Sequence, residues 1–404
     1  EAYKLKFNFK IDITFCFLQI LVVLQYINII SDLLPKFTQV VVFVCWYILA
    51  IRNRDFFNKS LRISILSFAI FLITLLRTII ADQINMNYYS PMQAVIQRYQ
   101  FFIYPIIYVY ICDLPKFKKK KLINLAFLSI LITIAVSFYY IFKVDPQAIR
   151  NTQRSIKLIG VGDFQLMYAL SLITGPLLMT IFNRWGKVQF KHFFELSFIF
   201  CSVLLCLILC NLVTSVVVAL ISMFVAFFLN SKSKLFRFVL ISVVSLLYGL
   251  KELIADSLYA LANQNIFYWS TNNKIVAIAN VLVGNFEQTD TLSRRDMLAS
   301  QSMESFYKNP VLGIDFKNHV AGNIGGHMQW ADDLARFGIF GNLIIIINYI
   351  MIAVYTIKTS KDKIVRDSMM ATWITFAILG FLNPLLSGPI LMMIFVVIPL
   401  LNNY

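Results

Sequence analysis

The residues best suited to chemistry gather in one polar segment, 293–341, of a chain that is otherwise strongly apolar. This segment contains the adjacent pair Arg294 and Arg295 and two histidines, His319 and His327. Guanidinium groups bind phosphates through paired N–H donors, and a neutral imidazole accepts a proton near pH 7. A chain with so few polar residues is expected to gather them where it carries out catalysis or recognition.

The start of this segment carries a helix signal. Ser293 followed three residues later by Asp296 has the pattern of a capping box, so the sequence predicts a helix from Ser293 that stops at Asn309-Pro310. Both arginines would then lie in the first turn, where the backbone N–H groups already present positive charge. That placement suits a phosphate or pyrophosphate. Exposed arginines paired with Asp290 or Asp296 are the simpler interpretation.

The end of the segment supplies a candidate base. His327 follows two glycines, which let the backbone come close to a ligand, and we expect it to take a proton from an attacking hydroxyl. Trp330 can stack on a sugar or anchor the membrane interface. Asp333 can act as a carboxylate base, orient His327 or serve only as a helix-start charge. Asp332 and Arg336 have the spacing of a helical salt bridge.

A second cationic segment lies earlier, at 143–163. There Arg150, Arg154 and Lys157 recur at i, i+4 and i+7, which places them on one face of a helix. They form either a solvated face that touches lipid headgroups or a surface for an anionic ligand. Arg77, near the end of an apolar run, either extends toward the interface or lines a cavity.

The elements that must position these residues are membrane helices. The 404 residues are 59% hydrophobic and only 14% charged, with a mean hydropathy of +0.74, whereas a soluble domain is about a quarter charged. The sequence predicts an all-α polytopic membrane protein without a soluble nucleic-acid-binding domain. Apolar runs long enough for helical spans occur at twelve places: 11–30, 37–51, 63–80, 99–112, 122–142, 164–182, 193–211, 213–229, 238–254, 338–357, 368–385 and 388–401.

The lysines and arginines predict the orientation of these spans. The opposite orientation would carry the KFKKKK run at 116–121 across the membrane, against the positive-inside bias. Both termini are therefore expected in the cytoplasm. The chain divides into a transmembrane bundle at 1–254, an extracytoplasmic loop with short helices at 255–337 and further membrane helices at 338–404.

Several chemistries lack their motifs. The sequence has no GxxxxGK[ST] loop, no HExxH and no GxSxG, so nucleotide hydrolysis, zincin and α/β-hydrolase activities are not supported. All six cysteines fall within or at the end of apolar runs, which gives no CxxC metal site. We expect no metal and no cofactor. A reaction would need a substrate that reaches the outer face already activated.

The motifs together resemble the Wzy-type polysaccharide (O-antigen or capsule) polymerase and O-antigen ligase superfamily. The resemblance rests on Arg294-Arg295, Asn309-Pro310-Val311-Leu312-Gly313, His327 and Leu334-Ala335-Arg336-Phe337-Gly338-Ile339-Phe340-Gly341, with Arg154-x₅-Gly160 upstream. The sequence departs from the family in two places. Gly162-Asp163 lacks the asparagine that often follows the upstream glycine, and Thr214-Ser215-Val216 lacks an arginine.

The resemblance implies a metal-independent, inverting glycosyltransferase that polymerises undecaprenyl-diphosphate-linked oligosaccharide repeat units at the outer face of the bacterial cytoplasmic membrane. His327 would be the general base, and Arg154 with Arg294 or Arg295 would hold the diphosphate. The donor and acceptor would both be lipid-linked oligosaccharides, with membrane lipids, a chain-length regulator and a flippase as further partners and no nucleic acid.

Other readings stay open. A ligase would pass a finished glycan to another acceptor. A flippase for lipid-linked oligosaccharides would show two similar halves, and no internal repeat is seen. A non-enzymatic partner in a cell-wall complex would tolerate replacement of His327.

Overall fold

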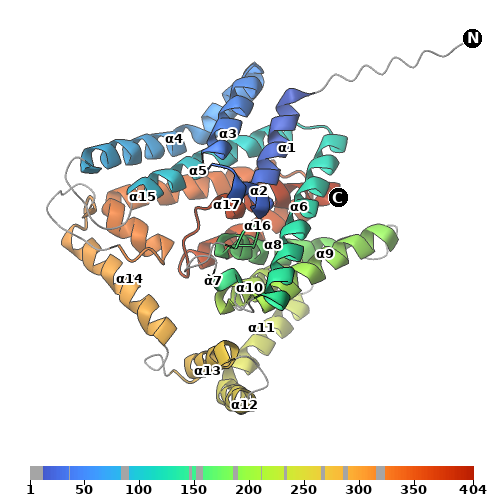
Figure 1. The fold of residues 1–404 in the computed structure, drawn as a ribbon, viewed down its shortest axis with the longest axis vertical. Helices are drawn as coiled ribbons and strands as arrows, with labels where there is room; N and C mark the ends of the chain where they lie inside the picture. The colour runs from blue at the N-terminus through green and yellow to red at the C-terminus, as the bar shows by residue number, and fades with distance from the viewer. Residues whose placement is uncertain are drawn as a thin grey trace, which may run out of the picture.

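The computed structural model describes residues 12–35, 37–82, 91–144, 148–151, 158–184, 190–210, 212–231, 234–264, 269–284, 290–314 and 324–404. Every regular element within these ranges is helical (Figure 1). The elements are α1 (Ile13–Tyr26), α2 (Asn28–Leu33), α3 (Thr38–Ala50), α4 (Arg54–Asp82), α5 (Pro91–Cys112), α6 (Lys116–Lys143), α7 (Ala148–Asn151), α8 (Phe164–Arg184), α9 (Phe190–Leu209), α10 (Val213–Asn230), α11 (Lys234–Gly249), α12 (Lys251–Asn263), α13 (Trp269–Val283), α14 (Asp290–Lys308), α15 (Gln329–Thr359), α16 (Lys363–Leu379), α17 (Gly388–Met392), a π-helical turn (Met393–Val397), α18 (Ile398–Leu400) and a final 3₁₀ turn (Leu401–Asn403).

Six helices in the described part of the chain are long and apolar enough to cross a membrane. Three shorter apolar helices accompany them, at Ile13–Tyr26, Thr38–Ala50 and Gly388–Asn403. The six long ones are Arg54–Ile79, Lys116–Lys143, Phe164–Arg184, His192–Leu209, Val213–Asn230 and Gln329–Thr359.

The outer surfaces of these helices are apolar. On α15, Phe340, Leu343, Ile347 and Ile350 are all exposed, and α9 exposes phenylalanines in the same way. Patches of this extent are rare on proteins surrounded by water, but lipid tails solvate them without cost. The fold is therefore that of a multi-pass membrane protein.

Each of the twelve predicted spans overlaps helical chain, with three interruptions that the hydropathy did not indicate, the last of them in the run 368–385, where α16 ends at Leu379. The run 11–30 breaks at Ile27, between α1 and α2. Thr133 of α6 satisfies the backbone at this break, since its hydroxyl donates to the Tyr26 carbonyl and lies 3.3 Å from the Asn28 amide nitrogen. The run 238–254 breaks at Leu250, where α11 gives way to α12.

Segments that the charge bias assigns to one side of the membrane contact one another. Among the predicted inner segments, Lys59 pairs with Asp113 at 2.8 Å and Lys118 pairs with Asp12. Among the predicted outer segments, the Gly160 amide donates to Asp32, and the Asn28 side chain donates to the Val161 carbonyl at 2.8 Å. The helix ends therefore sort into two groups, as alternating crossings require.

Helices α12 and α13 pack against each other at the bottom of the view in Figure 1, away from α1, and α14 runs from them back to α15. α14 then packs along the start of α15. Within the predicted extracytoplasmic loop 255–337, α14 is thus the helix that packs against α15.

α15 bends at Gly338, the residue at which the predicted tenth span begins. Gly338 has φ 64° and ψ −170°, a conformation that is nearly exclusive to glycine. The turn Asn309–Gly313 fills the bend, because the Ile339 amide donates to the Pro310 carbonyl at 2.8 Å and the Phe340 amide to the Val311 carbonyl at 3.4 Å.

The bend also frees a carbonyl that an unbroken helix would use. In a straight helix the Phe340 amide would donate to the carbonyl of Arg336. Here the Arg77 guanidinium of α4 donates to that carbonyl at 3.0 Å, and it lies over the Phe337 ring. Arg77 is buried, so its role in the fold is to hold α4 against the bend in α15.

We predict that Gly338→Ala destabilises the protein. The unfavourable backbone conformation alone costs about 1–3 kcal/mol, and the new Cβ would lie 2.4 Å from the Val311 carbonyl oxygen. The melting temperature in detergent measures the loss. Gly249→Ala is the matched control, because nothing lies within 4 Å of that position. An equal, small effect of both substitutions would contradict the role of the bend.

Candidate functional site

The helix that carries the arginine pair begins earlier than predicted. α14 starts at Asp290, so the predicted start at Ser293 is wrong, and Arg294 and Arg295 lie beyond the first turn. The physical reason is electrostatic. A carboxylate suits the positive helix start and two guanidinium groups do not, so starting at Asp290 relieves the conflict. A helix-terminus phosphate site therefore has no support, although the guanidinium groups remain.

Arg295 connects α14 to the bundle. Its partly exposed side chain reaches the hydroxyl of Tyr168 in α8. That hydroxyl in turn donates to Asn383 Oδ1 at 2.9 Å, in the turn between α16 and α17. A surface cation is thereby linked to a buried polar group through one tyrosine.

A short hydrogen-bond network holds the loop that carries His327. The Ser302 hydroxyl of α14 donates to Asp332 Oδ1 at 2.6 Å and accepts from the Gly325 amide at 2.9 Å. The Gly326 amide also points to Asp332 Oδ1, at 3.2 Å. The residue before His327 is therefore fixed between two helices, while the histidine itself is exposed.

Beneath this loop lies a buried ion pair that the sequence reasoning missed. Arg98 of α5 binds Asp333 Oδ1 with one terminal nitrogen and donates to the Tyr349 hydroxyl with the other, at 2.9 Å. Arg98 is 3% exposed and Asp333 is fully buried. The sequence left three roles open for Asp333, namely a carboxylate base, an orienting group for His327 and a helix-start charge. The partner that the structure shows for it is Arg98.

Arg98 was overlooked because it precedes the predicted span 99–112 by one residue. α5 begins at Pro91, so Arg98 lies two turns inside a helix. A signal was present in the sequence, since a lone arginine at the edge of an apolar run needs a partner carboxylate.

Three further predicted site residues contribute to packing. Arg336 is buried at 3% exposure, on the same helix as Asp332 and close enough to it to interact electrostatically. Arg77 binds the bend, as described above. Trp330 is partly exposed, and its indole N–H donates to the Ala377 carbonyl at 2.9 Å.

The remaining predicted residues fall wholly or partly outside the described structure. His319, Arg154 and Lys157 lie outside the described residues. Arg150 and Arg294 lie on α7 and α14, but their side chains are not among those described. Arg295 therefore lies on α14, and His327 lies on the loop that packs against the same helix at Ser302, two turns farther along. Of the second cationic segment, Arg154 and Lys157 lie outside the described residues.

Two carboxylates meet beside α8. Asp163 Oδ1 accepts from the Leu166 amide at 2.9 Å and so caps the start of α8. Asp32 binds the Gly160 amide at 3.0 Å. The surrounding protein removes water from the Asp163 carboxyl and raises its pKa above the usual value, and the Asp32 carboxylate adds to that rise.

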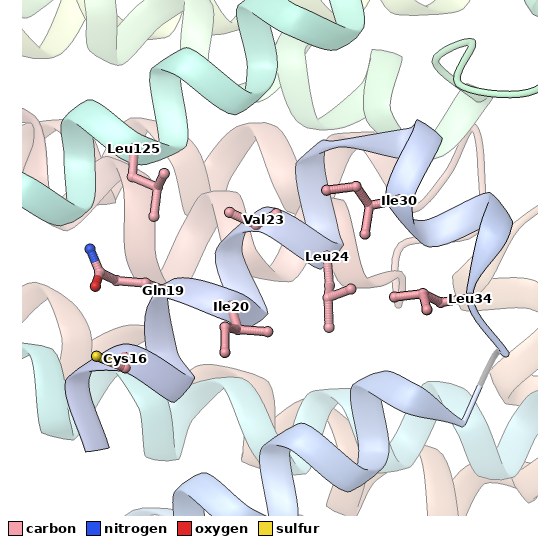
Figure 2. Close-up of a pocket in the computed structure, with 8 residues that line it drawn as sticks. All are labelled: Cys16, Gln19, Ile20, Val23, Leu24, Ile30, Leu34 and Leu125. Carbon is pink, nitrogen blue, oxygen red and sulfur yellow. The ribbon is translucent and has the colours of Figure 1, made fainter. Parts of the chain in front are cut away.

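A cavity in the described part of the chain lies on other elements. It is an apolar groove of about 450 Å³ along α1 and α2, closed on one side by Leu125 of α6 (Figure 2). Ile20, Val23 and Leu24 of α1 point into it (Figure 2). Its lining offers no charged group, so it is not the place for the chemistry that Arg295 and His327 suggest.

The arrangement around α14 offers a cation, a proton acceptor and a fixed loop. Within the described part of the chain, no three His, Cys, Asp or Glu side chains lie close enough together to hold a metal ion. What the site can do is bind an anion at Arg295 and accept a proton at His327.

No protein-family model matches this chain, and no curated protein shows significant sequence similarity to it. Arguments about function therefore depend on the residues and their geometry.

We predict that Arg98→Ala lowers the free energy of unfolding by about 3–5 kcal/mol, because it leaves Asp333 as a buried charge without compensation. Lys59→Ala is the control. It breaks a half-exposed ion pair, which is worth about 0–1 kcal/mol. Reversible denaturation in mixed micelles compares the two. Similar losses would mean that the buried pair does not hold α5 to α15.

We expect Asp163→Asn to stabilise the folded protein by an amount that depends on pH. The amide oxygen keeps the cap on Leu166, while the charge that the folded state disfavours is removed. Because the folded pKa of Asp163 is raised, the wild-type protein loses stability as the pH rises from the unfolded pKa, about 3.9, through the folded one. The melting temperature of the variant should exceed that of the wild type at neutral pH and approach it in acid. A gain that is the same at every pH would refute this.

Proposed function

We propose that this chain is an integral membrane glycosyltransferase that joins lipid-diphosphate-linked oligosaccharide repeat units at the outer face of a bacterial cytoplasmic membrane. It has about twelve spans, with both termini in the cytoplasm and a large extracytoplasmic loop before α15. The long apolar helices of the multi-pass fold support this arrangement.

The sidedness is supported by the contacts at the helix ends. Lysine-rich segments such as 116–121 meet other segments assigned to the inner side through Lys59–Asp113 and Lys118–Asp12. Arg295 and His327 belong to the opposite group of chain segments. The positive-inside bias then places the candidate site outside the cytoplasm.

The observation that carries the proposal is how α14, the turn after it and α15 pack together. The Asn309–Gly313 motif fits into the bend at Gly338, and Ser302 ties α14 to the loop before α15. Motif pieces that the sequence separates thus form one unit, with Arg295 and His327 on it. A catalytic site requires rigid support of this kind for the residues that touch the substrate.

In the proposed reaction, His327 takes the proton of an acceptor hydroxyl as its oxygen attacks the anomeric carbon of the donor. The bond from that carbon to the diphosphate oxygen breaks, and the diphosphate leaves with the electron pair. Arg295, with Arg294 beside it in the chain, stabilises the departing charge. Base catalysis contributes roughly 10²–10⁴-fold, and a fixed charge partner contributes about 10²–10³-fold. Neither nucleotide nor divalent metal takes part.

We predict that the purified protein lengthens glycan chains when it is given lipid-linked repeat units in liposomes without nucleotide or metal. His327→Ala should slow this by about 10²–10⁴-fold and Arg295→Ala by about 10²–10³-fold. Arg295→Lys should retain part of the activity, since it keeps the charge but loses the paired donors. Gel electrophoresis of the products measures the lengthening.

Matched controls come from the same chain. Lys308→Ala removes an exposed cation of α14 that pairs with Glu304, and His192→Ala removes a histidine that pairs with Glu195 on α9. Both controls should polymerise normally. If a folded Arg295→Ala or His327→Ala variant has normal activity, the catalytic role assigned to that residue is wrong. If the products show a single transfer and not a ladder of repeats, the protein is a ligase.

A further inference from the structure

The chain between α16 and α17 is non-helical and yet buried. Residues 380–387 leave the helical path at Gly380, and α17 begins at Gly388. Asn383, Leu385 and Ser387 are at most 6% exposed. Irregular backbone inside a membrane protein is tolerated where it is enclosed by protein or lines a functional cavity.

Neutral polar side chains surround this turn. Gln329 of α15 accepts from the Leu385 amide at 3.0 Å, and Tyr168 donates to Asn383 at 2.9 Å. On the other side, Gln25 lies against Gly388 and accepts from Tyr104 at 2.9 Å. Each of these side chains is more than nine-tenths buried. No charged side chain is among them.

Two polar atoms of the turn have no hydrogen-bond partner among the residues that the structure describes. They are Asn383 Nδ2 and Ser387 Oγ, on residues that are 4% and 6% exposed. A buried donor without a partner costs about 1–3 kcal/mol, and native proteins keep few of them. Two such atoms lie four residues apart in one turn, so an ordered water or a bound ligand would complete their hydrogen bonds.

The chemistry of these atoms selects the class of ligand. An amide N–H₂ is a donor, which disfavours a metal cation. No charged side chain is among the described contacts of the turn named above, which disfavours a buried anion. An amide, a hydroxyl and phenols match a neutral group that both donates and accepts. Sugar hydroxyls have this property.

We propose that the α16–α17 turn is a subsite for an uncharged sugar residue of the glycan, held by Asn383 and Ser387. Arg295 contacts Tyr168, and Tyr168 contacts Asn383, so the subsite lies one side chain away from the cation that holds the diphosphate. The sugar nearest to the diphosphate is the residue that this spacing fits. The assignment rests on the proposed function for its substrate, but its own evidence is the pair of unsatisfied buried atoms.

Trp330 marks the edge of this subsite. Its ring lies within 2.4 Å of where a side chain on Gly380 would begin, so the glycine leaves room for the indole to cover the turn. Because Trp330 is partly exposed, it connects the buried turn with the surface.

The test uses the full-length protein in lipid nanodiscs and measures thermal stabilisation by free sugars at millimolar concentration. The panel contains glucose, galactose, mannose, rhamnose, N-acetylglucosamine and N-acetylgalactosamine. At least one should raise the melting temperature of the wild type. Asn383→Ala and Ser387→Ala should each weaken its apparent affinity about tenfold, the value of one lost hydrogen bond.

Asn348→Ala is the matched control, since Asn348 is a buried asparagine whose amide is satisfied by Ser67 of α4. It should leave sugar binding unchanged. Inorganic pyrophosphate provides a separate arm, in which stabilisation should depend on Arg295 and survive Asn383→Ala.

The outcomes separate the two proposals. Sugar binding that depends on Asn383, in a protein that shows no chain lengthening, keeps the subsite and rejects the proposed reaction. Chain lengthening with no sugar-induced stabilisation, or stabilisation that survives Asn383→Ala and Ser387→Ala alike, overturns the subsite and leaves the reaction standing.

Discussion

The structure depends on the fit of the Asn309–Gly313 turn into the bend of α15. Gly338 adopts a backbone conformation that other residues avoid, and in return two amides of α15 find carbonyls in the turn. Without that exchange, the break in a membrane helix would leave polar groups unpaired, at several kcal/mol each. Arg295 lies on α14 and His327 on the loop before α15, and this contact joins the end of α14 to α15.

The same demand to satisfy polar groups explains the buried arginines. Arg77 binds a carbonyl that the bend frees, and Arg98 neutralises Asp333 and meets Tyr349. Side chains that look like ligand-binding groups in the sequence are thus used to hold helices together. Arg295 is partly exposed and His327 is exposed, and these are the two residues to which the proposed reaction assigns a role.

How much the sequence could predict follows from what each signal measures. Hydropathy located the membrane helices, because lipid-facing surfaces must be apolar along their whole length. The end of α14 at Asn309-Pro310 was predictable from local chemistry, whereas its start was placed at Ser293 on the capping-box pattern and lies at Asp290 in the structure. The Arg98–Asp333 pair and the Arg295–Tyr168–Asn383 chain join residues 235, 127 and 215 positions apart. No local pattern indicates such contacts, since they arise from how the helices pack.

The central claim is that a lipid-linked diphosphate binds beside Arg295, facing His327, on the outer side of the membrane. An electron cryo-microscopy map of the protein in nanodiscs, prepared with an undecaprenyl-diphosphate-linked oligosaccharide, tests it most directly. The account predicts diphosphate density within hydrogen-bonding distance of the Arg295 guanidinium, at the membrane face opposite the lysine-rich segment 116–121. Density at the lysine-rich face, or a bound diphosphate that Arg295 does not touch, would contradict it.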